Sequence, residues 1–208
     1  MMKELTIYLI RHGMTRANIE FIYYGNTELP LEPEGIEDLK RLKALGIYPE
    51  GAERYFTSGM IRTNQTIAIL FPHADYTIVP GLKECNLGDF EMKTHDEIKD
   101  TDAYLQWIED KTGTIGCPGG EDRNEFGARV TGAFREVVDS LEREGIDTAV
   151  IVFHGGPIVK VMQAYTGEEK SFADWQPLNG LGYKVTLQKE GTDLKIVGYT
   201  EIKEKMNE

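Results

Sequence analysis

The sequence predicts an α/β protein with three layers (α/β/α), in which helices cover both faces of a mostly parallel sheet that ends in a C-terminal hairpin. Short apolar segments rich in strand-forming residues alternate with amphipathic helical patterns, as in successive β-α units. Near the C-terminus, apolar and polar residues alternate with the period of two that is typical of half-buried strands. The 208 residues suffice for a single core, so we expect residues 1–208 to form one domain.

Strand and helix patterns follow one another in the first part of the chain. Residues 5–10 are apolar and rich in β-formers, which predicts a buried strand. Residues 33–45 place isoleucine and leucine at helical spacing behind a proline that is tolerated in a first helical turn. A second strand is predicted at 54–57, a helix at 59–70 and a third short strand at 77–79.

The middle of the chain predicts helices joined by loops. Residues 94–97 have the spacing of a capping box, and apolar residues follow at helical intervals over 104–108. Glycine and proline gather at 113–120, which indicates a loop. A long helix with an apolar stripe is predicted over 126–141. We therefore expect a helical insertion at about residues 85–130.

The C-terminal part of the chain predicts one more β-α unit and a hairpin. Residues 148–153 (Thr-Ala-Val-Ile-Val-Phe) form a continuous strand-forming run, and His154 follows directly. A helix with an apolar stripe over 158–165 comes next. Residues 183–187 alternate in polarity, and after a turn near residues 190–191 the chain returns over 194–199, which predicts two antiparallel strands.

The composition excludes several function classes. The formal net charge of −12 argues against general nucleic-acid binding, which needs a basic footprint. No segment approaches the ~20 apolar residues of a membrane span, and the N-terminus lacks a signal-peptide pattern. We therefore expect a cytoplasmic protein that binds no membrane. Cys85 and Cys117 are expected to be free thiols, and neither has the spacing of a zinc site.

Four basic side chains are predicted to converge at one edge of the sheet. Arg11 and His12 follow the first strand, and His154 follows the last parallel one. Arg62 lies early in the helix after the second strand. Ligands bind outside the carboxyl ends of the strands in an open parallel sheet, so these residues form a candidate site. An acidic protein that handles an anion needs such a local concentration of positive charge.

Two arginines and two histidines suit phosphoryl transfer. A phosphate monoester carries nearly two negative charges, and its transfer depends on positioning and on neutralising the equatorial oxygens. Arginine binds phosphate in a bidentate way, and a neutral imidazole can attack phosphorus to form a covalent intermediate. The arginines would repel a cation and no metal-ligand spacing is present, so we expect neither a metal nor a cofactor.

Residues 9–18 (Leu-Ile-Arg-His-Gly-Met-Thr-Arg-Ala-Asn) resemble the signature of the histidine phosphatase, or phosphoglycerate mutase-like, superfamily. The hallmark of this family is Arg-His-Gly after the first strand. Further segments similar to family motifs follow in the expected order, at residues 24–25, 31–35, 58–66, 82–91, 118–121 and 152–156. The resemblance spans about residues 5–160 and implies a phosphoglycerate mutase-like fold.

The resemblance implies a role for each matched catalytic side chain. His12 would be the nucleophile, whereas Arg11, Arg62 and His154 would bind the phosphoryl group. Glu84 would donate a proton to the leaving oxygen and later activate the attacking water. A carboxyl beside a doubly negative phosphate holds its proton more readily than a free one, which suits a general acid.

Other matched residues would contribute to substrate binding. The resemblance implies that Asn18, Thr15 and the backbone N–H of Gly155 contact phosphate. Arg16 and Arg123 lie within or beside motifs, and the sequence leaves their contact with substrate open.

Four positions depart from the usual pattern of the family. Met14 stands where Glu or Gln is common, and Ala17 where many mutases have Trp. Residues 90–92 read Phe-Glu-Met in place of the commoner Trp-Glu-Gly. None of these changes removes a catalytic group, so they bear on the substrate rather than on the reaction.

The favoured function is a phosphatase that hydrolyses a small phosphorylated metabolite through a phosphohistidine. One alternative is a cofactor-dependent phosphoglycerate mutase, but such mutases carry a longer insertion with an arginine pair, and residues 89–112 contain no arginine. The other is a non-catalytic phosphate-binding regulatory module, which would be expected to lose His12, His154 or Glu84. The motif form and short insertion are similar to those of α-ribazole phosphatases, and broad sugar-phosphate phosphatases share them. The sequence leaves open the leaving group and the oligomeric state, including a homodimer.

Overall fold

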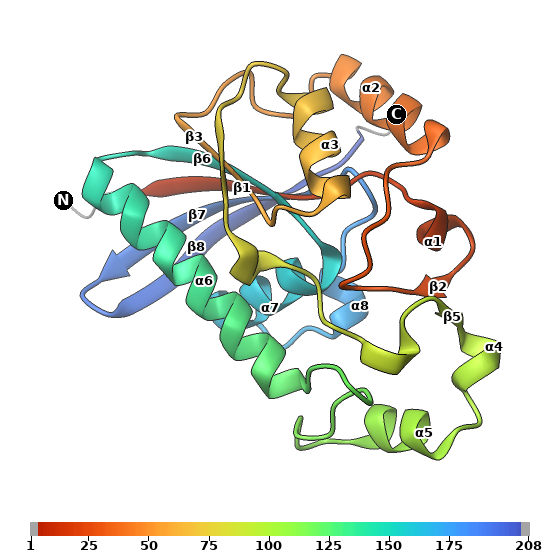
Figure 1. Cartoon of the computed structure of the whole chain (residues 1–208). Helices are drawn as coiled ribbons and strands as arrows, with labels where there is room; N and C mark the ends of the chain where they lie inside the picture. The colour runs from red at the N-terminus through yellow and green to blue at the C-terminus, as the bar shows by residue number, and fades with distance from the viewer. Residues whose placement is uncertain (1–3, 205–208) are drawn as a thin grey trace.

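The central sheet has six strands in the part of the chain that this computed structural model describes, residues 4–204 (Figure 1). Its order is β4-β3-β6-β1-β7-β8. The parallel strands are β1 (Leu5–Arg11), β3 (Arg54–Thr57), β4 (Tyr76–Ile78) and β6 (Thr148–Phe153). The antiparallel hairpin of β7 (Gly182–Glu190) and β8 (Asp193–Ile202) continues the sheet beside β1. The predicted mostly parallel sheet with a C-terminal hairpin is confirmed.

Helices cover both faces of the sheet (Figure 1). α2 (Pro33–Ala44) and α3 (Ile61–Leu70) pack on one face, and α6 (Arg123–Glu144) and α7 (Gly155–Tyr165) pack on the other. The predicted three-layer class is therefore confirmed. α3 begins at Ile61 rather than at Gly59, because Gly59 adopts φ 87° in the turn after β3.

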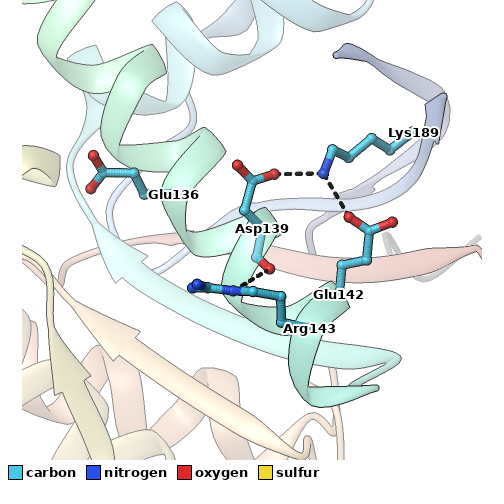
Figure 2. Close-up of a pocket in the computed structure, with 5 residues that line it drawn as sticks. All are labelled: Glu136, Asp139, Glu142, Arg143 and Lys189. Carbon is cyan, nitrogen blue, oxygen red and sulfur yellow. Dashed lines mark hydrogen bonds and ion pairs between the residues drawn. The ribbon is translucent and has the colours of Figure 1, made fainter. Parts of the chain in front are cut away.

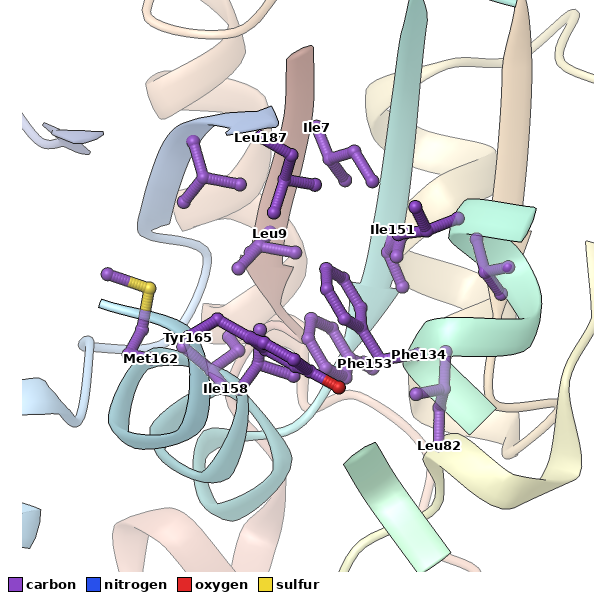
Figure 3. Close-up of a cluster of buried hydrophobic side chains, with 14 of the residues drawn as sticks. Ile7, Leu9, Leu82, Phe134, Ile151, Phe153, Ile158, Met162, Tyr165 and Leu187 are labelled. Atoms are coloured by element: carbon purple, nitrogen blue, oxygen red, sulfur yellow. The ribbon is translucent and has the colours of Figure 1, made fainter. Parts of the chain in front are cut away.

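Alternating residues of the same strands bury the two faces of the sheet. Ile7, Leu9, Ile151 and Phe153 lie in the core on the side of α6 and α7 (Figure 3). Val152, between two of them, points instead to the core formed with α2 and α3. Because both faces are covered, the central strands read as continuous apolar runs rather than as alternating ones.

Both ends of α6 are capped by residues that satisfy its free main-chain groups. The Asp122 carboxylate accepts the N–H groups of Asn124 and Glu125, and Glu125 bonds back to the Asp122 N–H. Gly145 ends the helix in the left-handed conformation, with φ 74°. Neither α6 nor any other helix within residues 4–204 is long and apolar enough to cross a membrane.

The segment between β4 and α6 consists of short elements. These are η1 (Pro80–Leu82), η2 (Gly88–Phe90), β5 (Lys93–Thr94), α4 (His95–Ile98) and α5 (Asp102–Glu109). β5 pairs with β2 (Ile22–Tyr23) in a small second sheet. α6 already begins at Arg123, so the last part of the predicted insertion at 85–130 belongs to a helix that packs on the main sheet.

Several local expectations were wrong or incomplete. α1 (Arg16–Ile19) and α8 (Phe172–Trp175) were not predicted, because four residues are too few to show a helical period. Leu45, expected on the buried face of α2, is exposed because the helix ends one residue earlier. Leu105 and Ile108, expected on an apolar face of α5, are also exposed, because α5 packs through its other side.

Candidate active site

The predicted histidines and arginines lie together where β1 and β6 end. The two strands are adjacent and parallel, with Arg11 opposite Phe153, so the residues that follow them meet. The rings of His12 and His154 form an edge contact with centroids 5.2 Å apart. Arg62, in the first turn of α3, donates from Nε to Nδ1 of His154 at 3.3 Å. The expected convergence at one sheet edge is therefore observed.

The hydrogen bonds of buried His12 define which ring nitrogen carries the proton and which has a free lone pair. Nδ1 lies 2.7 Å from the Gly13 carbonyl oxygen, which can only accept, so Nδ1 carries the proton. Nε2 is then unprotonated, and it lies 3.4 Å from the Tyr24 hydroxyl. Burial lowers the pKa of His12 well below its usual value, and Arg62 and Arg11 lower it further. The imidazole is thus neutral at physiological pH, with the free lone pair that a nucleophile requires.

Main-chain carbonyl groups, rather than carboxylates, hold Arg11 and Arg62 in place. Arg62 donates to the carbonyl oxygens of Gly25 at 2.7 Å and Thr27 at 3.0 Å. Arg11 donates to that of Pro177 at 2.8 Å, and its buried Nε has no hydrogen-bond partner in the described chain. Neither arginine forms an ion pair with a described residue. Arg62 is buried and Arg11 half-buried, and two such guanidinium groups without a carboxylate in ion-pair contact favour binding of a dianion.

Glu84 is a half-buried carboxyl in the wall of the same cavity. Its Oε1 accepts the Cys85 N–H at 2.9 Å, and its Oε2 accepts the Gly156 N–H, at the start of α7, at 3.0 Å. A Cβ at Gly156 would lie 2.3 Å from the carboxyl oxygen, so only glycine allows this approach. Burial raises the pKa of Glu84, although the two N–H groups, Arg62 and Arg11 oppose the rise. A carboxyl with a raised pKa can hold a proton for a leaving group.

Thr15, Asn18 and Tyr24 form a hydrogen-bonded network beside His12. Asn18 Oδ1 accepts from the Thr15 N–H and hydroxyl, both at 3.0 Å, and from the Tyr24 hydroxyl at 2.9 Å. Because its oxygen is occupied, Asn18 has its side-chain NH₂ to offer a ligand in the cavity that it lines. Thr15 is fully buried and does not line the cavity, so its position suits orienting Asn18 rather than contacting substrate.

His154 and Gly155 lie behind the cavity lining. Ser58 Oγ lies 2.8 Å from His154 Nε2, so both ring nitrogens of His154 have partners. Burial and then Arg62 lower the pKa of His154 well below its usual value, which leaves this ring neutral. Gly155 packs on Arg11, since an added Cβ would lie 3.4 Å from the Arg11 Nε. Both residues thus support the arginines, and their direct contact with a phosphoryl group stays a prediction.

The cavity has a volume of about 660 Å³ and extends well beyond the groups expected to act on phosphorus. Its further lining residues are Ile22, Tyr23, Cys85, Leu87, Trp107, Glu121, Arg123, Phe126, Lys160, Gln163, Phe172 and Gln176. Arg16 is largely exposed and paired with Glu20 at 2.8 Å, outside the cavity. The sequence left open whether Arg16 or Arg123 contacts substrate, and of the two only Arg123 lines the cavity.

Several residues of the site were not assigned a role from the sequence. Tyr24 approaches His12, Ser58 bonds to His154, and Gly156 binds the carboxyl that is expected to act as the acid. These three residues lie in segments similar to family motifs, so a signal for them was present.

Elsewhere in the described chain, no second group of reactive side chains is apparent. A hollow beside α6 and β7 is lined by Glu136, Asp139, Glu142, Arg143 and Lys189 (Figure 2). Lys189 is paired there with Asp139 at 2.7 Å and with Glu142 at 2.6 Å. Within residues 4–204, no three His, Cys, Asp or Glu side chains are grouped to hold a metal ion. Cys85 and Cys117 are free, as predicted.

Comparison with known proteins identifies the family. The chain matches the histidine phosphatase superfamily (branch 1) over residues 7–200. It is 29% identical to the broad-specificity phosphatase YOR283W of Saccharomyces cerevisiae, over 76% of this chain and 69% of that protein. It is 30% identical to the adenosylcobalamin/alpha-ribazole phosphatase of Escherichia coli, over 73% and 74% of the two chains. It is 32% identical to the probable phosphoglycerate mutase GpmB of Yersinia pestis, over 73% and 70%.

Solved structures agree with the fold. The alpha-ribazole phosphatase of Shigella flexneri matches with a TM-score of 0.75, over 92% of this chain and 94% of that one. At 23% identity, this similarity concerns the fold alone. The family match covers nearly the whole chain, and the expected motifs lie around one cavity. The protein is therefore an enzyme of the histidine phosphatase superfamily, branch 1.

Proposed function

We propose that this enzyme is a phosphatase that hydrolyses a small phosphomonoester through a phosphohistidine at His12. The observation that carries the proposal is the neutral, Nδ1-protonated imidazole beside the guanidinium groups of buried Arg62 and half-buried Arg11, neither of which forms an ion pair with a carboxylate. Such a site attracts a phosphate dianion and offers a lone pair toward it. Glu84, with its raised pKa, supplies the proton that an alkoxide leaving group needs.

The reaction then has two displacements at phosphorus. First, Nε2 of His12 attacks phosphorus while the ester P–O bond breaks, and Glu84 transfers its proton to the leaving oxygen. Arg11, Arg62 and the Asn18 amide neutralise the equatorial oxygens. Next, water attacks the phosphohistidine, gives a proton to Glu84, and the P–N bond breaks to release phosphate. The cycle consumes one ester and one water, and both residues return to their starting states.

Trapping the intermediate tests the proposal. Rapid quenching with ³²P-labelled p-nitrophenyl phosphate should give an acid-labile, base-stable phosphoprotein in the wild type and none in His12→Ala. His12→Ala should lose at least ~10³-fold in kcat, whereas His73→Ala, at an exposed histidine, should remain active. Activity should survive EDTA. A wild type that forms no phosphoprotein and releases no phosphate would favour the non-catalytic module instead.

A phosphoglycerate mutase is the second candidate, because one relative carries that name and two further basic side chains, Arg123 and Lys160, line the cavity. The absence of arginine from residues 89–112 favours hydrolysis. With 3-phosphoglycerate and a trace of the bisphosphate, we expect phosphate release with little isomerisation. Efficient interconversion of the two monophosphates would overturn this choice.

A further inference from the structure

Two cations lie in the cavity beyond the groups proposed to act on phosphorus. Lys160 follows Gly156 by one turn of α7, so it projects from the same helix face that holds Glu84. Arg123 is the first residue of α6, and Gly127 follows it by one turn. A Cβ added at Gly127 would lie 3.9 Å from Nζ of Lys160, so the ammonium group lies against the start of α6. Arg123 and Lys160 are therefore neighbouring cations.

Neither cation has a carboxylate partner among the described residues. Arg123 donates to the carbonyl oxygens of Trp107, at 2.7 Å, and of Asp110, and its guanidinium carbon lies 5.9 Å from the Trp107 ring centroid. Nζ of Lys160 lies 5.8 Å from the ring centroid of Phe126. Adjacent positive charges without a counter-charge repel each other, and an anion bound by both would relieve that repulsion.

The carboxylates that line the cavity do not neutralise these cations. Glu121 forms a two-point ion pair with Arg129, with both hydrogen bonds at 2.6 Å. Glu84 is occupied by two main-chain N–H groups. Burial, followed by the field of Arg123, lowers the pKa of Lys160. The cavity thus concentrates positive charge in a chain with a formal net charge of −12, as recognition of a polyanionic ligand requires.

We infer that Arg123 and Lys160 bind a second anionic group, a carboxylate or a second phosphate, on the leaving-group part of the substrate. The inference rests on the proposed phosphatase function and narrows its substrates to phosphomonoesters whose alcohol part is itself an anion. Tyr23 and Trp107 in the cavity wall would contact the carbon skeleton between the two charges.

The test compares compounds that share a phosphate and differ in the second charge. 3-Phosphoglycerate and glycerol 3-phosphate differ by a carboxylate, whereas fructose 1,6-bisphosphate and fructose 6-phosphate differ by a phosphate. Calorimetry with His12→Ala, which cannot turn the compounds over, gives Kd, and the wild type gives kcat/KM. In at least one pair, the compound with the second anion should bind roughly tenfold tighter or more. The preference should weaken at high salt, and the pair that shows it identifies the second group.

Variants of Lys160 assign the preference to this site. Lys160→Met should remove most of the preference for the compound with the second anion, chiefly by raising its Kd and KM. Lys160→Arg keeps the charge and should retain the preference. Lys184→Met removes the same charge from an exposed position on β7 and serves as the matched control.

Equal Kd values within both pairs, or a preference that survives Lys160→Met, would overturn the inference. Because Kd is measured without turnover, either result is distinct from a failure of the wild type to hydrolyse p-nitrophenyl phosphate. That failure would contradict the proposed phosphatase function alone.

Discussion

Glu91 and Arg62 both bind the loop at residues 25–27, Glu91 through the loop's main-chain N–H groups and Arg62 through the loop's carbonyl oxygens. Glu91 accepts the N–H groups of Gly25 and Thr27, and Arg62 donates to the carbonyl oxygens of the same two residues. Glu91 also accepts the Thr27 hydroxyl at 2.6 Å. The loop is closely packed, since a Cβ at Gly25 would lie 1.7 Å from the carbonyl oxygen of Cys85. Glu91 therefore positions Arg62 through the main chain, although it does not line the cavity.

Glu91→Gln should loosen this loop and displace Arg62. The amide leaves main-chain N–H groups unpaired, which costs about 1–3 kcal/mol of unfolding free energy per group. We expect a lower Tm and about a tenfold rise in the inhibition constant of vanadate, which imitates the transferring phosphoryl group. Glu53→Gln is the control, because that carboxylate accepts the N–H groups of Asp147 and Thr148 at the other end of the strands. An unchanged vanadate constant in Glu91→Gln would show that the loop does not position Arg62.

Glu84→Gln should affect substrates according to their leaving groups. Removing a general acid costs ~10²–10⁴-fold in rate when the leaving group needs a proton. The variant should therefore impair hydrolysis of an alkyl phosphate much more than that of p-nitrophenyl phosphate, whose phenolate leaves readily. Arg62→Ala should impair both about equally, because the phosphoryl group is common to them. Steady-state kinetics on both substrates decide the point, and equal losses in Glu84→Gln would remove Glu84 from the role of proton donor.

The buried histidines should make the fold sensitive to acid. Burial lowers the pKa of both His12 and His154, so below about pH 6.5 the unfolded chain binds protons that the native state does not. Stability should fall as the pH drops below that value, by up to about 1.4 kcal/mol per pH unit for each histidine. Urea unfolding at several pH values measures the slope, which His12→Asn should reduce. His73→Asn, at an exposed position, should keep the wild-type slope, and an equal slope in all three proteins would refute the linkage.

Met92→Gly should stabilise the protein. Met92 adopts φ 62°, a conformation that a side chain disfavours, and it stands where the family commonly has glycine. Relief of this strain outweighs the entropy that glycine loses on folding, so we expect a gain of about 0.5–1 kcal/mol. Thermal unfolding measures the effect, and Met92→Ala, which keeps the Cβ, is the matched control. A glycine variant no more stable than the alanine variant would mean that the left-handed backbone carries no strain.

Local residue patterns predict the layered sheet and the edge at which the site forms. Strands 5–10 and 148–153 were predictable because strands covered on both faces are nearly continuous apolar runs. The meeting of His12 and His154 was also predictable, because parallel strands bring their carboxyl ends to one edge. These features depend on local patterns and on a general rule of α/β topology.

Packing between distant segments sets which matched side chains reach the cavity. Thr15 and His154 belong to matched motifs, yet neither lines the cavity, and their side chains bond to Asn18 and Ser58 instead. Lys160, in no matched motif, lines the cavity because α7 packs beside α6.

The hydrogen bonds and pKa values of these side chains depend on partners that are remote in the chain. Glu84 receives the N–H of Gly156, 72 residues away, and Glu91 receives that of Gly25, 66 residues away. Burial among such partners raises the pKa of Glu84, whereas a local pattern of residue types records neither the partner nor the burial. The sequence therefore determined which groups reach the sheet edge, and packing between distant segments decided their protonation and orientation.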